Sequence, residues 1–185
     1  LPDALLSHWQ ATEPQLVSLA ERMGLQWQEF FSGLTPEHQT ALQTVLTLSD
    51  YVADAFPRDH EHLCHAIIDG SINAQINSKK LNEWLDTLAR GAESEDDWHA
   101  ALRKLRRRAM VHIIWRDALK KASTLETTRA LSQLADVCVI RSIQFLSPLL
   151  ESRHGQPVGK ESGEQQHLLV IGMGKLGGWE LNLSS

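Results

Sequence analysis

The sequence predicts a mainly α-helical chain that leads into the opening of a domain with a β-sheet. Apolar residues recur at helical spacing through about the first 150 of the 185 residues. Residues that typically start or stop helices flank these stretches. The one convincing buried strand, LLVI at 168–171, comes late and follows a polar, glycine-rich stretch. We therefore expect a helical domain over residues 1–150, and a linker with the start of a second domain over 151–185.

The first two helices are predicted from the prolines and glycines at their ends. Pro14 opens the first helix and Gly24 ends it, because proline suits a first turn and glycine suits the residue just past a last one. The second helix covers residues 35–56, with Thr35 as its N-cap and Pro36 in the first helical position. The proline that follows residue 56 ends this helix.

Two shorter helices follow in the sequence. One covers residues 60–68 and ends at Gly70. Ser78 is expected to cap the next, over residues 79–90, and Gly91 to end it.

Two long helices complete the helical domain. Ser94 and Asp97 resemble a capping box, with Asp in place of the usual Glu, ahead of a helix over residues 98–121. Ser123 and Glu126 form a second box ahead of the last helix, over residues 127–150. The polar stretch after it, ESRHGQPVGKESGEQQ, is expected to be an exposed connection or a weak hairpin.

Composition restricts the class of protein. The net charge of −5 argues against a nucleic-acid binder or an anionic-membrane binder, which would usually carry a basic excess. Cys64 and Cys138 are far apart in the sequence and indicate neither a disulfide framework nor a zinc site. No apolar run approaches the roughly 20 residues that span a bilayer, and the first residues do not resemble a secretion signal. We expect a cytoplasmic protein.

Two helical segments carry residues that could bind a metal ion, a phosphate or a partner protein. The histidine segment, DHEHLCH at 59–65, lacks the H-E-x-x-H spacing, and two histidines on one helix face rarely bind zinc without a third ligand. We expect a polar helix surface there, formed by His60, His62, Cys64 and His65. The basic segment at 103–108 fits a solvated helix face paired with acids, or a face with arginines that contact phosphate or an acidic partner. The candidates for such contacts are Arg106, Arg107 and Arg108.

The glycine-rich segment after the predicted strand is the strongest candidate site. Gly172, Gly174 and Gly177 spell G-x-G-x-x-G, and Lys175 adds a positive charge. Such a turn either holds a phosphate on its backbone amides or simply links a strand to a helix. An NAD(P)-dependent oxidoreductase is a distant alternative, because a dinucleotide fold needs an acidic residue about 20 positions further on. Glu180 is the only acid after these glycines.

A longer string resembles a known family. The segment LLVIGMGKLGGWELNLSS, together with LTLSDYVAD at 47–55 and LRKLRRRAMVHIIWRDAL at 102–119, is similar to the glutamine synthetase adenylyltransferase family. These bifunctional enzymes carry two nucleotidyltransferase halves in one chain. The resemblance points to the first half, which removes AMP from a glutamine synthetase tyrosine by phosphorolysis and releases ADP.

The resemblance implies a polymerase-β-like α/β domain that begins at the predicted strand, with magnesium as cofactor. The ligands of that magnesium would be a D-x-D pair expected just beyond Ser185, so no catalytic residue is expected within this chain and the chain alone should be inactive. Which glycine meets the phosphate stays open. The residues expected to contact phosphate or nucleotide are Gly172, Gly174, Lys175, Gly177, Gly178, Ser184 and Ser185.

The implied partners are glutamine synthetase and the PII signal protein, with ATP, ADP and phosphate as small molecules of the parent enzyme. An alternative from another class is a helical docking module for glutamine synthetase or PII that performs no chemistry.

Overall fold

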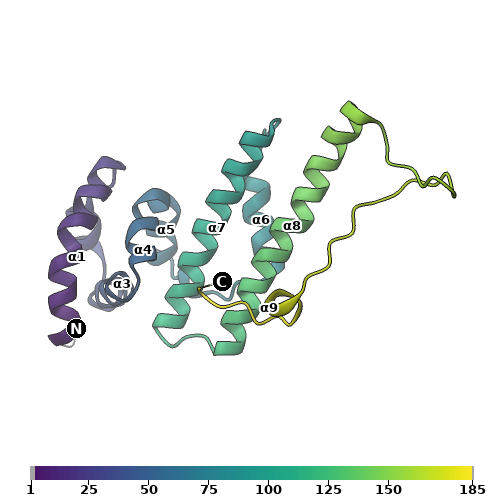
Figure 1. Ribbon diagram of the computed structural model, residues 1–185. Helices are drawn as coiled ribbons and strands as arrows, with labels where there is room; N and C mark the ends of the chain where they lie inside the picture. The colour runs from purple at the N-terminus through teal and green to yellow at the C-terminus, as the bar shows by residue number, and fades with distance from the viewer. Residues whose placement is uncertain (1–2, 185) are drawn as a thin grey trace. The chain divides into compact units, whose positions relative to one another are not determined.

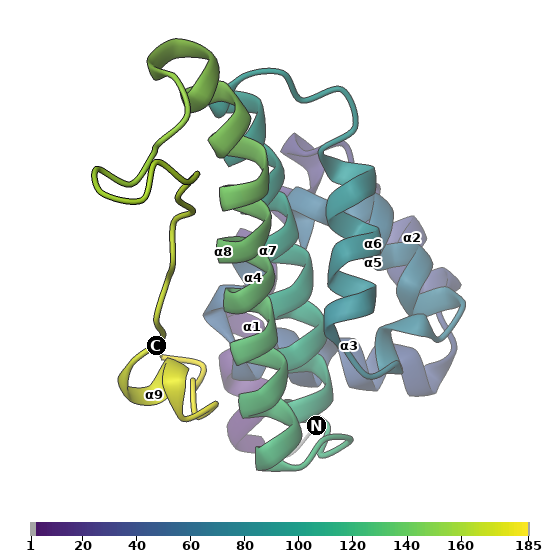
Figure 2. The same ribbon diagram turned by 90° about the vertical axis from the view of Figure 1, so that its right-hand side faces the viewer.

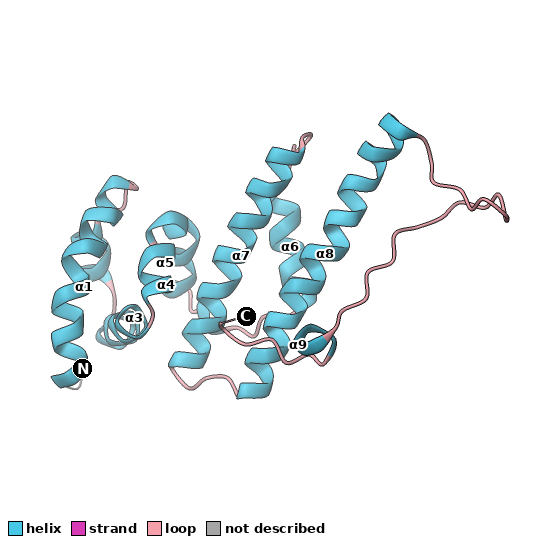
Figure 3. Cartoon of the chain, in the orientation of Figure 1, coloured by secondary structure: helices cyan, strands magenta, loops and turns pink. Residues whose placement is uncertain are grey.

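The computed structural model describes residues 3–184, and these residues are mainly helical (Figure 1). Figure 3 shows helices joined by loops, with no strand in the described range. The chain divides into two compact units. Unit 1 contains Leu1–Ile76 and Arg106–Thr127, and unit 2 contains Asn77–Leu105 and Thr128–Ser185. Two long helices, α7 (Glu95–Ala118) and α8 (Thr124–His154), contribute residues to both units.

Unit 1 is built from short helices around an aromatic core. Trp27 is almost completely buried and stacks on Phe31, with ring centroids 5.5 Å apart, while Phe56 meets its ring edge-on. Such pairs add to the stabilisation that burial alone provides. The elements before the α7 segment are α1 (Asp3–Arg22), α2 (Trp27–Gly33), α3 (Pro36–Leu48), α4 (Asp50–Ala55), the 3₁₀ turn η1 (Pro57–Asp59), α5 (His60–Ile68) and η2 (Ser71–Asn73).

The first helix begins much earlier than the sequence predicted. Pro14 lies inside α1 and not in its first turn. Proline removes one backbone hydrogen bond from a helix interior. Trp9, Leu16 and Ala20 recur on one face of the helix and are buried, and α1 packs against α3 and α4. Burial on both sides of the proline therefore outweighs the local preference for a helix start.

The second predicted helix is two helices. Thr35 caps α3 as expected, its hydroxyl accepting a hydrogen bond from the His38 amide at 3.3 Å, and Pro36 is the first helical residue. The helix then stops at Leu48, because Ser49 adopts an extended conformation and its hydroxyl accepts from the Val52 amide. Serine competes well for backbone amides in this way, so it starts α4 inside an otherwise helical pattern.

In unit 2, α6 (Ser78–Leu88) and the first part of α7 pack against α8; the three helices are labelled in Figure 2. Trp98 is buried, stacks on Phe145 with ring centroids 4.5 Å apart, and donates to the Ser142 hydroxyl at 3.1 Å. Arg141 of α8 donates to Asn82 and Asp86 of α6. Aromatic and polar contacts thus join all three helices of this unit.

Helix caps in the second half of the helical part agree largely with the sequence. The Ser94 hydroxyl accepts from the Asp97 amide at 3.1 Å and the Asp97 carboxylate accepts from the Ser94 amide at 3.2 Å, which confirms the capping box. The N-cap of α6, however, is Asn77, whose side chain accepts from the Lys80 amide, and not Ser78. Asparagine and serine serve about equally well as N-caps, so the sequence alone does not decide between these two neighbours.

Two helix ends meet glycines with positive φ, and one helix is longer than expected. The helix α5 covers the predicted residues, and Gly70 follows it with φ +78°. The last long helix continues past residue 150 to His154, and Gly155 then turns with φ +80° and donates its amide to the Glu151 carbonyl. Polar residues 151–154 are compatible with a helix, so the change in composition did not mark its end.

The predicted strand at 168–171 does not form in this structure. Leu168–Ile171 have no secondary structure and are exposed, Leu169 by 79%. A strand is stable only when neighbouring strands complete its hydrogen bonds, and the described residues provide none. The preceding linker does contain the weak hairpin pairing considered above, as one antiparallel bridge between Val158 and Gln165.

Candidate functional site

The glycine-rich segment forms a tight, one-turn helix, α9 (Gly174–Gly177). Gly174 starts the turn with φ +57°, a conformation that favours glycine. The Gly177 amide donates to the Met173 carbonyl at 3.3 Å, and the Gly178 amide donates to the Gly174 carbonyl at 2.9 Å. Backbone hydrogen bonds alone therefore close this turn.

The glycine at position 177 is required by a close approach of two backbone segments. A Cβ atom on Gly177 would lie 2.5 Å from the carbonyl oxygen of Gly172 and 3.1 Å from its carbonyl carbon. A Cβ on Gly172 would in turn lie 3.3 Å from the Leu176 side chain. Any side chain at position 177 would thus force the two ends of the turn apart.

The turn presents amides and a positive charge to an anion. The first amides of a helix have no acceptor within it, and no side chain of Met173, the N-cap residue, accepts from them. Lys175 lies in this same turn and is exposed. Unpaired backbone amides at the start of a helix, with a lysine in the same turn, are suited to phosphate or carboxylate oxygens.

The remaining predicted contacts of this site lie just after α9. The Ser184 hydroxyl donates to the Asn182 side-chain oxygen at 3.0 Å and is exposed. Trp179 takes a positive φ of 60° as the chain leaves the turn. Ser185, also predicted to contact phosphate, lies outside the described residues.

The three predicted arginines lie in unit 1, where each has a distinct environment. Arg108 forms an ion pair with Asp59 at 2.9 Å, and both side chains are largely buried, at 11% and 14% exposure. Arg106 lies over the ring of Tyr51, 5.8 Å from its centroid. Burial raises the pKa of Tyr51, while the charges of Arg106 and Arg107 partly oppose that shift. Arg108 is therefore engaged within its own unit.

The histidine segment lies on α5 and at its start. His60 shares a hydrogen bond with the Pro57 carbonyl at 2.9 Å. His62 meets His112 of α7, with 3.2 Å between their Nε2 atoms. The described residues hold no group of three or more His, Cys, Asp or Glu side chains placed to bind a metal ion.

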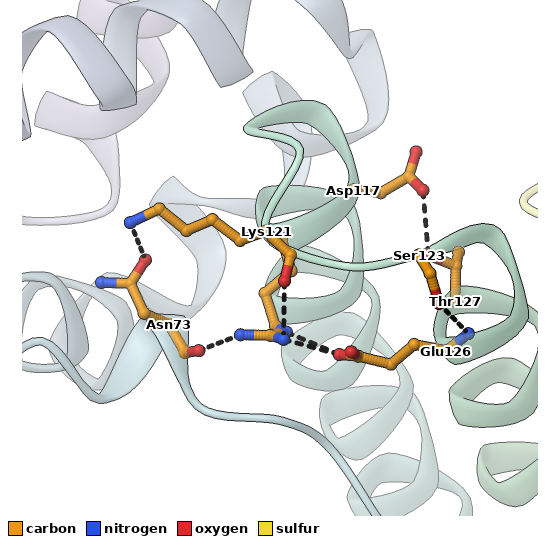
Figure 4. Close-up of polar contacts among 7 residues, drawn as sticks. Asn73, Asp117, Lys121, Ser123, Glu126 and Thr127 are labelled. Carbon is orange, nitrogen blue, oxygen red and sulfur yellow. Dashed lines mark hydrogen bonds and ion pairs between the residues drawn. The ribbon is translucent and has the colours of Figure 1, made fainter.

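A polar cluster centred on Arg116 was not anticipated from the sequence (Figure 4). The Arg116 guanidinium donates twice to the Glu126 carboxylate, at 2.9 and 2.7 Å, and also to the backbone carbonyls of Asn73 and Lys121. One side chain at the end of α7 thus contacts the start of α8 and the last residue of η2.

Neighbouring side chains extend this Arg116 cluster. The Asn73 side-chain oxygen accepts from Trp115 at 3.1 Å and from Lys121 at 2.7 Å. Thr127 of α8 donates to Asp117 of α7 at 2.9 Å. The only sign of this cluster in the sequence was Glu126, the acidic residue of the second predicted capping box. In the structure its carboxylate accepts hydrogen bonds from Arg116 of α7. The cluster fixes the turn between α7 and α8 within unit 1.

None of the described helices combines the length and low charge needed to cross a bilayer.

Comparison with known proteins adds to this geometry. The profile of the family "Glutamate-ammonia ligase adenylyltransferase" matches residues 39–185. Similar proteins carry the name bifunctional glutamine synthetase adenylyltransferase/adenylyl-removing enzyme. One from Pseudomonas putida is 36% identical over 82% of this chain and 16% of its own length. One from Pseudomonas aeruginosa is 38% identical over 76% of this chain and 14% of its own length.

A third relative of that name, from Shewanella oneidensis, is 38% identical over 86% of this chain and 16% of its own length. The chain thus spans about one sixth of the length of these relatives. The profile match includes α5, α7 and α8 as well as the glycine-rich turn, so the similarity is not limited to a short motif. The chain belongs to the glutamate-ammonia ligase adenylyltransferase family.

Proposed function

We propose that this chain is the N-terminal part of the deadenylylating half of a bifunctional glutamine synthetase adenylyltransferase/adenylyl-removing enzyme. In that reaction an oxygen of inorganic phosphate attacks the phosphorus of AMP on a glutamine synthetase tyrosine. The bond from phosphorus to the tyrosine oxygen breaks, ADP leaves, and the tyrosine hydroxyl is restored. The family match and the self-closed glycine turn support this proposal.

The observation that carries the proposal is the contact between positions 172 and 177. Because Gly177 has no Cβ, the backbone of Gly172 can lie directly against it, and we infer that this contact holds the amides of the turn in place. Amides held in this way need no reorganisation when negative charge develops on the transferred phosphoryl group. We assign Lys175 to hold phosphate oxygens together with the amides of Gly174 and Leu176, since a point charge suits a phosphate in this position.

Magnesium would neutralise the phosphates and activate the attacking oxygen in such an enzyme. The described residues do not fit a magnesium site, because Glu180 is the only carboxylate between positions 172 and 184 and no ligand group is found elsewhere. We therefore assign no step of the reaction to a metal held by this chain. Ser184 is assigned a place beside the reacting phosphates on the basis of the family string alone.

The helical units are proposed to position the protein substrate. Glutamine synthetase appears in the names of the relatives as the protein on which those enzymes act. Docking of glutamine synthetase or of the PII protein on these helices is compatible with catalysis at the adjoining turn. ATP, ADP and phosphate would then be ligands of the parent enzyme.

The test uses the parent enzyme and measures ADP released from adenylylated glutamine synthetase in the presence of magnesium and phosphate. We expect Lys175→Ala and Gly177→Ala to lower the rate by about 10²–10³-fold, the range found when one preorganised donor is removed from an active site. Lys160→Ala, an exposed lysine of the linker, and Gly33→Ala, which meets nothing within 4 Å, serve as matched controls with unchanged rates.

Binding of glutamine synthetase is measured in parallel with the same variants. Loss of ADP release with binding intact supports the assigned phosphate turn. Equal loss of binding and of activity, or full activity of Lys175→Ala and Gly177→Ala, would contradict it and leave the chain as a docking module.

A further inference from the structure

A pair of histidines joins two helices inside unit 1. His62 of α5 and His112 of α7 lie with their Nε2 atoms 3.2 Å apart and their ring centroids 5.4 Å apart. His112 is only 1% exposed, and His62 is half-buried. The two residues are far apart in sequence, so this contact is part of what holds α5 against α7.

The geometry limits how many protons the pair can carry. At this distance one Nε2 must donate its hydrogen and the other must accept it with a lone pair. The pair can hold its hydrogen bond when both rings are neutral, or when one ring is protonated and donates to a neutral one. It cannot hold the bond when both rings are protonated, because two N–H groups would then face each other as like charges.

The surroundings oppose a second charge still further. On α7, Arg108 and Arg116 lie one turn before and one turn after His112, and their carboxylate partners are Asp59 and Glu126. These carboxylates are already engaged by the guanidinium groups and are not free to neutralise an added imidazolium.

On α5 and at its C-cap, the titratable groups that interact with one another near His62 are His65 and Asp69. The carboxyl of Asp69 is fully exposed, and its pKa is lowered chiefly by its hydrogen bonds with Ser71, with smaller contributions from His62 and His65. The neighbouring turn η1 contributes Arg58, which is paired with Asp54, and η2 contains no charged side chain.

We propose that His62 and His112 form an acid-sensitive contact that holds α5 against α7 near neutral pH. When both rings become protonated, the contact breaks and the two helices separate at this point. Once open, each ring titrates near the ordinary histidine pKa of about 6.5. The closed pair holds at most one proton and the open pair holds two, so opening takes up one proton. Below about pH 6.5 the opening equilibrium should therefore rise tenfold for each pH unit.

Hydrogen exchange of backbone amides in α5 and in the second part of α7 tests this proposal. After correction for intrinsic exchange rates, we expect protection to fall about 15-fold between pH 6.5 and 5.0, because the uptake of one proton on opening is half complete at pH 6.5. In His62→Gln the amide keeps a hydrogen bond to His112 but does not titrate, so this fall should disappear. His65→Gln, which changes an exposed histidine of the same helix, should behave like the wild type.

Nitrogen-15 spectra of the wild-type imidazoles provide a second measurement that does not depend on how a variant folds. Near pH 7.5 one ring should carry hydrogen on Nε2 and its partner should not, and the folded chain should accept one proton at this pair on acidification. Protection that is independent of pH, the same fall in His62→Gln as in the wild type, or two imidazolium rings in the folded chain would each overturn the proposal.

Discussion

Replacing Arg116 with methionine tests whether the Arg116 cluster is an important source of stability in unit 1. The change keeps an unbranched apolar stem and removes the guanidinium. Glu126 then loses both hydrogen bonds to its carboxylate, and the carbonyls of Asn73 and Lys121 lose a charged donor. The side chains of the ion pair are 13% and 23% exposed, so water reaches the remaining groups only in part.

The expected loss follows from this partial burial. Breaking a fully buried pair costs about 3–5 kcal/mol, because one charge is left buried without a partner. An exposed pair contributes about 0–1 kcal/mol. The Arg116–Glu126 pair lies between these limits. Its arginine also donates to two carbonyls, and a hydrogen bond that involves a charged group contributes about 1.5–3 kcal/mol net of the exchange with water. We expect Arg116→Met to lower the free energy of unfolding by about 2–4 kcal/mol.

Urea denaturation followed by circular dichroism measures this loss, and hydrogen exchange assigns it to unit 1. Arg58→Met is the matched control, since Arg58 pairs with Asp54 in the same unit but both side chains are well exposed. Its cost should be below about 1 kcal/mol. A cost for Arg116→Met as small as that of the control would refute the reasoning. So would additive effects of Arg116→Met and Glu126→Gln, because residues in direct contact should couple.

Three other outcomes are expected. Trp98→Ala should destabilise the chain by about 3–5 kcal/mol in urea denaturation, because Trp98 is buried and stacked on Phe145. The hydrogen bond from Ser94 holds the pKa of Asp97 below its ordinary value. The ionised carboxylate therefore stabilises the fold at pH values above its ordinary pKa, and this stabilisation is lost as the pH falls through the lowered pKa. Ser94→Ala should return the pKa of Asp97 toward about 3.9, as an NMR titration of the carboxyl would show. Burial raises the pKa of Cys64 to about 12, so alkylation near pH 8 should be at least about 100-fold slower in the folded chain than in urea, by peptide mass spectrometry.

The features that the sequence predicted correctly depend on neighbouring residues. The caps at Thr35 and Ser94 and the turn after Gly70 each follow from side chains and φ angles within four positions. Such signals can be recognised in the sequence because the groups that form each cap or turn lie within about one helical turn of one another.

The features that the sequence did not predict depend on contacts between distant residues, or on a choice between two neighbouring residues that suit the same position equally well. Pro14 lies inside α1 because tertiary burial overrides its preference. Asn77 and Ser78 are equally good caps, and propensity cannot choose between them. The Arg116 cluster joins positions that are 43 residues apart, for which a single sequence carries no signal. The strand at 168–171 also depends on distant contacts. It does not form because the described residues include no strand that pairs with it.

The uncovered run from Leu168 to Met173 has a consequence for how this chain behaves in solution. Its aliphatic side chains are exposed, and the segment pairs with no strand in the described residues. Any second copy offers the same unpaired amides and carbonyls, and six-residue segments that combine high β-propensity with no charge pair readily in this way. The isolated chain should therefore self-associate as its concentration rises. Replacing Val170 with lysine should keep it monodisperse, because a charged side chain opposes the pairing of such segments into a sheet.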